Sequence, residues 1–408
     1  MVTAIILKPV DLTLELTRRI KAHDDYLNAR ENGKRLILKS GKLDGKTLDG
    51  LNLSQSVLPG SSFIKSSVNK ADFSDADVFG CDFTAASLVQ TRFVKADLRG
   101  ANFTLADLSG AVMREADLRP GQIVNWGEEE ERRVDFSNAT LDGADFDDAK
   151  MESANLAVSS AQGATFRNVA LHAVNLAGAN LNGADLSGCN LKNANLTGTN
   201  LDNADLTGAN LTDANLRNVD LTKCILKDTN LMGAVHRDSQ ESLPDAIEAK
   251  LREHSRWIAS NGEFGKRATF KGEDLRGLDF SSCDVRGVSF DDAILSKAMF
   301  VRSEMFLTSF QGATLDGADF SFARASGTNF SHCDLTGSIF VGAWIETADI
   351  IAPDGRQIER RLSSRFAGTD LTGAAWTGTI VDGADLTGAR HDPHLLKLAT
   401  VKRVKQAA

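Results

Sequence analysis

The sequence predicts an all-β solenoid in which each coil has four sides. Three observations predict it: a five-residue period along most of the 408 residues, a small residue two positions before each central apolar residue, and an alternation of phenylalanine with smaller residues every ten positions. The composition agrees with a folded chain, because 42 % of the residues are apolar and only 6 are proline.

The five-residue period is clearest over residues 174–218, where a leucine recurs every fifth position and a small residue, mostly alanine, lies two positions before it. Residues two apart point the same way in an extended strand, so both share one face. Because five is odd, a continuous strand would turn that face outward in the next repeat. The chain must therefore turn a corner in every repeat, at the Ser/Thr/Gly-rich pair after the leucine.

The number of sides follows from a second period. Every tenth residue from Phe270 to Phe340 is phenylalanine, with smaller apolar residues midway between them. Such an alternation stacks into columns only if each coil has an even number of sides, and four sides give about 20 residues per coil, a narrow interior that these side chains can fill. We expect phenylalanine columns on two opposite faces and smaller residues on the other two.

Interruptions of the period define the organisation. We count 59 repeats, which as one continuous stack would extend roughly 70 Å. The segment after Pro244 has helical spacing of apolar residues and ends at a Gly-Lys-Arg triplet at 265–267. An N-terminal segment has the same helical spacing and ends at the same triplet at 33–35. This repetition indicates a tandem duplication with an offset of about 232 residues. The expected parts are a capping helix in 1–35, a β-helix over 36–234 with an insertion at 119–133, a helix module at 235–267, a second β-helix over 268–390 with an insertion at 351–365, and a C-terminal helix or tail at 391–408.

Helices are expected at the ends because an open β-helix end exposes unpaired strand groups and an apolar core. If both internal helices cap, the protein forms two lobes that meet near residue 240. If the second helix is only extruded, the protein is one rod. We favour two lobes.

The repeat Ala184–Gly188 matches the motif A(D/N)LxG, and many neighbours do the same. In this the sequence resembles the pentapeptide-repeat family over roughly residues 36–390, apart from the three interruptions. The resemblance implies a right-handed quadrilateral parallel β-helix with four pentapeptides per coil and the Asp/Asn position facing solvent. It also implies a mostly non-catalytic protein.

Residues with reactive side chains fit this expectation. All five cysteines occupy the small inward position, which predicts buried core filler rather than disulfides or zinc ligands, in a reducing compartment such as the cytoplasm. His23 and His254 lie on the apolar stripes of their helices, which favours packing or a cap hydrogen bond. His391 and His394 offer only two close metal ligands. Without catalytic or phosphate-binding motifs, we expect no enzyme activity, cofactor or metal, and without an apolar run of about 20 residues no membrane span.

Charge is distributed unevenly. The net charge of −9 argues against a general nucleic-acid binder. Residues 1–35, 235–267 and 390–408 together carry +6, so the repeats carry −15. The coils should therefore be acidic, and the C-terminal segment basic; its expected helix could mediate a homodimer.

The insertions hold the candidate protein-binding residues, because loops that leave a regular scaffold often carry recognition. They are Trp126, Glu128, Glu129, Glu130, Glu131, Arg132 and Arg133 in the first insertion and Arg360 and Arg361 in the second. The alternative is a solvated bulge left by an error in repeat register.

Two functions compete. The first is a non-catalytic protein-binding scaffold or adaptor of bacterial type. Repeat proteins of this shape resemble components encoded beside bacterial secretion systems, so a role associated with secretion belongs to this first function. The second is an acidic DNA mimic that modulates DNA gyrase or topoisomerase, as the quinolone-resistance pentapeptide proteins do. The length of the chain and its duplicated helices fit the second function less well.

Overall fold

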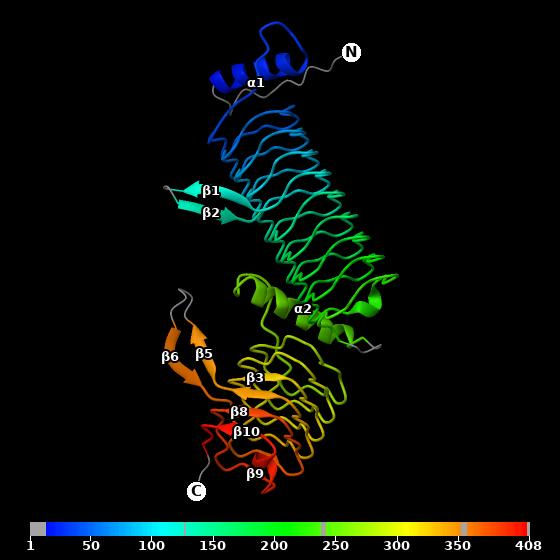
Figure 1. Cartoon of the computed structure of the whole chain (residues 1–408), viewed down its shortest axis with the longest axis vertical. Coiled ribbons are helices and arrows are strands. Elements are labelled where there is room, and N and C mark those ends of the chain that lie inside the picture. Colours follow the sequence, from blue (N-terminus) through cyan, green and yellow to red (C-terminus); the bar gives the residue numbers. More distant parts are fainter. Residues whose placement is uncertain (1–13, 126–127, 238–241, 352–356, 406–408) are drawn as a thin grey trace. The chain divides into compact units, whose positions relative to one another are not determined.

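A computed structural model describes residues 14–125, 128–237, 242–351 and 357–405. The chain forms two compact units, the first of residues 1–215 and 223–234, the second of residues 216–222 and 235–408. Each unit contains a stack of coils (Figure 1). The boundary differs from the expected one, because residues 216–222 belong to the second unit.

The coils have the predicted size. Parallel β-bridges join residues 20 positions apart, and each coil has four of them, as at Asp72↔Arg92, Asp77↔Asp97, Asp82↔Asn102 and Ser87↔Asp107. The N–H of each central residue donates to the next coil, for example from Phe73 to the Arg92 carbonyl at 2.7 Å. These bridges confirm the prediction of four sides per coil.

Each corner is made by a residue in the left-handed region two positions after the central residue. Asn203 (φ 60°) and Gly208 (φ 68°) are examples, and both residue types tolerate this conformation. The aspartate or asparagine before the central residue supports the corner, as when Asp107 Oδ1 accepts a hydrogen bond from the Ser109 N–H at 3.0 Å. The repeated aspartates are thus part of the turn.

Phenylalanine columns fill the core. In the second unit, Phe290, Phe310 and Phe330 stack with ring centroids 5.0 and 5.1 Å apart. The column on the opposite side meets them edge to face, as Phe320 meets Phe330 at 5.4 Å. Trp376 continues the opposite column next to Phe340, at 5.8 Å. The two-column prediction is confirmed.

The two insertions are β-hairpins, not loops. Antiparallel strands β1 (Gly121–Asn125) and β2 (Glu128–Arg132) form the first, and β5 (Ala348–Ile351) and β6 (Gln357–Leu362) form the second. The stack continues past both, because Asn102 bridges to Asp135 and Asn329 to Arg365. The second hairpin starts at Ala348, before the expected position 351.

Both predicted internal helices are present. Helix α1 (Leu14–Leu27) belongs to the first unit and α2 (Asp245–Ala259) to the second. Pro244 precedes α2, and Gly262 (φ 91°) ends it by donating to the Trp257 carbonyl at 2.7 Å. Leu251 of α2 is buried in the core of the second unit.

The prediction of a C-terminal helix is wrong. In the described residues past β9 (Arg390–His391), which end at 405, the only helical element is the 3₁₀ turn η2 (Leu395–Lys397). Strand β10 (Thr400–Lys402) then pairs in parallel with β8 (Ile380–Asp382). The segment forms another coil because the preceding coil offers unpaired strand groups, which a short separate helix would leave unsatisfied. A homodimer through a C-terminal helix is therefore no longer supported.

The remaining elements extend the bridges of the second unit. Strands β3 (Arg324–Ser326) and β4 (Trp344–Glu346) join β8 and β10 in a parallel sheet of order β10-β8-β4-β3, and β7 (Asp370–Leu371) pairs with β9. A 3₁₀ turn, η1, spans Leu221–Lys223.

Candidate interaction surfaces

The β1–β2 hairpin leaves the first unit at a fixed position. Its anchor is Arg132, whose Nε donates to the Gly100 carbonyl at 2.5 Å and whose Nη2 donates to the Gly80 carbonyl at 2.6 Å. These two carbonyls come from corners of successive coils. Burial lowers the pKa of the Arg132 guanidinium, although Asp82 and Glu130 oppose this effect. Even so, an arginine stays protonated at neutral pH.

Glycines let the base of the hairpin approach the coils. A Cβ atom on Gly121 would lie 2.8 Å from Phe79 Cε2, and one on Gly100 would lie 3.4 Å from Ile123 Cδ1. Gly100 also has φ of 66°. On the coil surface, the Arg99 guanidinium lies 5.4 Å from the centre of the Phe79 ring. The base of the hairpin therefore packs closely against Phe79 and Gly100.

The predicted recognition residues of the first insertion divide into four groups. Glu130, Glu131 and Arg133 are exposed. Glu128 and Glu129 pair through their backbones with β1, at Asn125 and Val124. Trp126 lies outside the described residues. Arg132 differs from the expectation, because its guanidinium faces the coils and positions the hairpin.

The second hairpin is built on the second unit. Gly327, a corner with φ of 64°, packs so closely on it that an added Cβ would lie 2.7 Å from Ala348 Cβ. Arg361 is exposed and pairs across the hairpin with Asp349 at 2.9 Å. Arg360 lies in the same strand, β6. The second insertion thus places Arg361 at the surface but engages its charge within the hairpin.

The two helix histidines make corresponding contacts in their own units. His23 Nδ1 accepts from the Leu36 N–H at 3.0 Å, and its Nε2 lies 3.0 Å from the Ser54 carbonyl. His254 Nδ1 accepts from the Ala268 N–H at 3.2 Å, and its Nε2 lies 2.9 Å from the Arg286 carbonyl. Burial lowers the pKa of both imidazoles, while their backbone hydrogen bonds oppose this. Cap hydrogen bonds, one of the two predicted roles, are confirmed. The spacings from each histidine to its two partners differ by one residue between the units, which supports a duplication.

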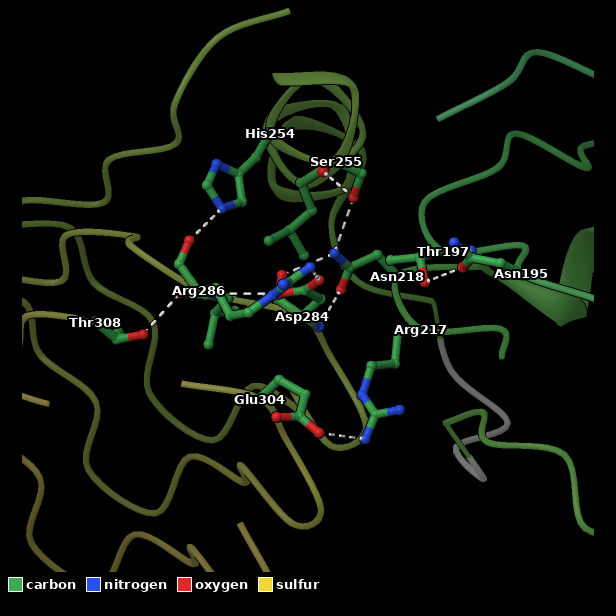
Figure 2. A network of polar contacts seen from close by, with 12 residues as sticks. Asn195, Thr197, Arg217, Asn218, His254, Ser255, Asp284, Arg286, Glu304 and Thr308 are labelled. Atoms are coloured by element: carbon green, nitrogen blue, oxygen red, sulfur yellow. Dashed lines mark hydrogen bonds and ion pairs between the residues drawn. The ribbon is translucent and has the colours of Figure 1, made fainter. Parts of the chain in front are cut away.

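A polar network joins α2 to the first coil of the second unit (Figure 2). The Asn218 amide imitates a neighbouring strand, since it donates to the Asp284 carbonyl at 2.8 Å and accepts from the Asp284 N–H at 2.9 Å. The same amide donates to Ser255 Oγ of α2 at 3.0 Å. Next to it, Arg217 pairs with Glu304 at 3.2 Å. Asn218 was not predicted, because it occupies a corner position that asparagine or glycine fills in most repeats.

Asp220 strengthens the same segment. It accepts hydrogen bonds from Thr222 Oγ1 and Ser242 Oγ, both at 2.6 Å. Burial alone would raise the pKa of this carboxyl, but the hydrogen bonds from Ser242 and Thr222 outweigh it and lower the pKa to about 2. This aspartate, unlike most in the repeats, is buried, so it contributes to structure and not to the charge of the surface.

The coil surfaces carry paired charges. The guanidinium of Arg99 contacts the Asp97 carboxylate at 2.7 Å, Arg119 contacts Asp117 at 2.7 Å, and comparable pairs recur along both stacks. Arginine also pairs with aspartate at Arg167–Asp147, Arg276–Asp274, Arg286–Asp284 and Arg390–Asp370. Arginines thus neutralise some of the aspartates on the coil surfaces.

The cysteines mostly follow the prediction. All five lie in the described part of the chain and none forms a disulfide. Burial raises the pKa of four thiols to about 12: Cys81, Cys189, Cys283 and Cys333. Cys224 is only partly buried, which differs from the expectation. Among the described residues, no group of three or more His, Cys, Asp or Glu side chains could hold a metal ion. Within the same residues, no helix has the length and apolarity that crossing a membrane requires.

Stacked parallel coils with a five-residue period define the class of this protein, a β-helical solenoid built from short repeats. A family model described as pentapeptide repeats (8 copies) matches seven segments of the chain, at residues 81–119, 132–168, 171–208, 199–235, 274–312, 303–342 and 313–350. These matches cover more than half of the chain. The chain belongs to the pentapeptide-repeat family, whose members form right-handed β-helices and are generally non-enzymatic structural or binding proteins.

Several solved structures are similar to this chain. HetL, a pentapeptide repeat protein involved in heterocyst differentiation regulation in the cyanobacterium Nostoc sp. strain PCC 7120, is 24 % identical over 53 % of this chain and 95 % of its own, with a TM-score of 0.22. A thylakoid-lumen pentapeptide repeat protein of Arabidopsis thaliana is 26 % identical over 31 % of this chain and 77 % of its own, with a TM-score of 0.20. QnrB1, a plasmid-mediated fluoroquinolone resistance protein, is 16 % identical over 50 % of this chain and 86 % of its own, also with a TM-score of 0.20. With such TM-scores, none of them carries an argument about function. No curated protein sequence matches the chain significantly.

Proposed function

We propose that this protein is a non-catalytic scaffold that binds a partner protein through the β1–β2 hairpin. The observation that carries the proposal is the anchoring of the hairpin by Arg132 to the carbonyls of Gly80 and Gly100. A hairpin held in this way presents its outer residues without first having to be ordered, which lowers the entropic cost of binding.

The anchor also argues against a bulge left by a register error. Removing a guanidinium from water is costly unless hydrogen bonds compensate, and here two carbonyls from different coils compensate. Gly121 adds a second fitted contact, since any side chain there would collide with Phe79. A solvated bulge needs neither contact. We therefore favour a recognition element over the bulge.

The exposed part of the hairpin suggests the chemistry of the partner. Glu130 and Glu131 are exposed on β2, within a run of four glutamates that starts at Glu128. Like charges along a strand discourage self-association at its edge and favour a basic partner surface. Trp126 is our predicted anchor for an apolar pocket in that partner, because aromatic residues carry much of the energy of interfaces. The partner should combine a basic patch with such a pocket.

Quantitative affinity capture tests this proposal. A partner retained by the wild-type chain should be lost with Trp126→Ala and with Glu130→Lys/Glu131→Lys, and the first loss should persist at raised salt. The matched control neutralises three exposed corner aspartates of the first unit that have φ near 60°: Asp148→Asn, Asp213→Asn and Asp228→Asn. Asparagine keeps the left-handed conformation, so this control should retain the partner. Greater loss from the control than from the hairpin variants would refute the proposal.

The second candidate is an acidic mimic of DNA that acts on gyrase, favoured by the charge of −15 on the repeats. Two observations make it weaker. With about 15 coils stacked about 4.8 Å apart, the repeats carry roughly one net charge per 4.8 Å, against one per about 1.7 Å in duplex DNA. In addition, arginines neutralise part of the aspartate columns, as at Arg119–Asp117. A supercoiling assay with purified gyrase, with and without a quinolone, distinguishes the two candidate functions. Inhibition of supercoiling by this protein, or its protection of gyrase from the quinolone, at micromolar concentration would favour the DNA mimic.

We further propose a cytoplasmic location. Its support is the set of five cysteines, none of which forms a disulfide. Fractionation of cells that produce the tagged chain would test it, and recovery in an oxidising compartment would contradict it.

A further inference from the structure

A groove of about 460 Å³ lies in the second unit between α2 and the first coil. Ala249, Lys250 and Glu253 of α2 form one wall, and the coil contributes Ala268, Thr269, Lys271 and Glu273, with Lys266 and Arg267 from the segment that precedes it. Thr269 is exposed. The volume is in the range of ligand-binding clefts, which is about 300–1,000 Å³.

The groove follows an open strand edge. In later coils the residue before the centre bonds to the preceding coil on both sides: the Ser309 N–H donates to the Val288 carbonyl at 2.9 Å, and the Ser309 carbonyl accepts from the Phe290 N–H at 2.7 Å. Thr269 holds this position in the first coil of the stack, where no coil precedes it. Within the described part of the chain, its backbone N–H and carbonyl take part in no hydrogen bond.

Other sides of the same coil are closed by side chains. Asn218 pairs with both backbone groups of Asp284, and Arg237 donates to the Asp279 carbonyl at 3.2 Å. His254 contacts the Arg286 carbonyl. The cap thus covers both backbone groups of Asp284 and the carbonyl of Asp279, whereas the edge at Thr269 is open.

The first unit shows how this edge can be closed. Ile37 corresponds to Thr269, and the Arg19 guanidinium of α1 donates to the Ile37 carbonyl. The residue that corresponds to Arg19 in α2 is Lys250, which instead pairs with Glu273 and lies 5.1 Å from the centre of the Phe270 ring. Glu273 corresponds to Gly41, which has no side chain to attract a cation. Two substitutions between the copies therefore turn the capping cation away from the edge.

We propose that this groove binds an extended acidic peptide segment of a partner protein, which adds a strand to the edge at Thr269. An extended chain offers the carbonyl and the N–H that the Thr269 backbone lacks, a mode of recognition used by many peptide-binding domains. Charge selects an acidic segment, because the lining contains four cations, Lys250, Lys266, Arg267 and Lys271, and two anions, Glu253 and Glu273. Two of these cations also have a carboxylate nearby, since Lys250 pairs with Glu273 and Lys271 lies 3.7 Å from Asp292. The site is separate from the β1–β2 hairpin.

Fluorescence anisotropy with the full chain tests the proposal. The probe is a fluorescein-labelled eight-residue peptide of alternating Glu and Val with both ends blocked, at about 0.15 M salt. Lys266→Glu/Lys271→Glu should weaken its binding by about tenfold or more, which is about 1.4 kcal/mol. The matched control Lys34→Glu/Lys39→Glu changes the corresponding residues of the first unit and should bind within about twofold of wild type, because the edge there is closed.

A second pair of measurements separates strand addition from simple charge attraction. Lys250→Arg/Glu273→Gly restores the closed arrangement of the first unit, and it should weaken binding by about tenfold although it removes a negative charge from the groove. A peptide with proline at its centre should not bind, because proline lacks the N–H that the Thr269 carbonyl requires. This second test needs no altered protein.

Three results would overturn the proposal. The first is that the wild-type chain shows no saturable binding of the peptide. The second is that Lys250→Arg/Glu273→Gly binds the peptide as tightly as wild type does and that the wild-type chain binds the proline peptide equally well. The third is that the wild-type chain binds an eight-nucleotide oligo-dT more tightly than the peptide. None of them bears on the hairpin, whose variants lie outside the groove, so the two proposals fail independently.

Discussion

Replacing Arg132 by methionine should free the β1–β2 hairpin while leaving both units folded. Methionine keeps most of the aliphatic stem but removes the two charge-assisted hydrogen bonds at 2.5 and 2.6 Å. Bonds of this kind contribute about 1.5–3 kcal/mol each. Gly80 is partly exposed, so water can replace the lost donor there, whereas Gly100 is buried. We therefore expect the hairpin to open more easily by about 2–4 kcal/mol.

Hydrogen exchange followed by mass spectrometry measures this effect directly. An opening that is easier by about 2.8 kcal/mol accelerates amide exchange about a hundredfold, if exchange follows local opening. The acceleration should be confined to peptides that cover residues 121–132 and be absent from the coils after 134. The control is Arg133→Met, since Arg133 is adjacent and exposed. Unchanged protection of the hairpin in Arg132→Met would show that Arg132 is not its anchor.

Three further predictions concern the coils and caps. Leu201→Asp should destabilise the first unit by about 3–5 kcal/mol in urea titrations, because it buries a carboxylate. Asn200→Asp on the outer face should cost less than about 1 kcal/mol. Equal losses would show that the inward and outward positions of the repeat are misassigned. The pKa of His254 in the folded protein lies below its usual value of 6.5. Its contribution to the free energy of unfolding is therefore complete above about pH 6.5 and is lost as the pH falls through the lowered pKa. The urea midpoint should fall between pH 7 and 5, and it should fall less in His254→Gln. An aromatic disulfide reagent should label Cys224 first in the native protein and leave the four buried thiols unlabelled; rapid labelling of several would contradict the inward register.

The repeat determines what could be predicted from the sequence. The five-residue period and the spacing of residues such as Phe290 and Phe310 have one geometric solution, so the coil size and the core columns follow from them. The helix histidines were also predictable, because His23 and His254 lie on apolar stripes and can satisfy backbone groups there. These features depend on local pattern, which the sequence contains directly.

Features that depend on long-range pairing were not predictable. The partners of Arg132 lie on corners of two earlier coils, and only the direction of the hairpin brings them together. The C-terminal segment has the apolar spacing of a helix, with Leu395 and Leu398, but the open edge of the preceding coil offers a better set of hydrogen bonds. The groove at Thr269 did leave a signal, namely the change from Arg19 to Lys250 between the copies, but its meaning requires knowing which carbonyl the arginine caps.

Photo-crosslinking from the hairpin tests the central claim most directly. A benzoylphenylalanine placed at Glu130 should give a covalent adduct with a specific partner protein, and Arg132→Met should abolish that adduct although the chain stays folded. The same group at Asp213, exposed on the coils of the same unit, should give no adduct with this partner. Equal adducts from both positions, or an adduct only from Asp213, would contradict recognition by the β1–β2 hairpin.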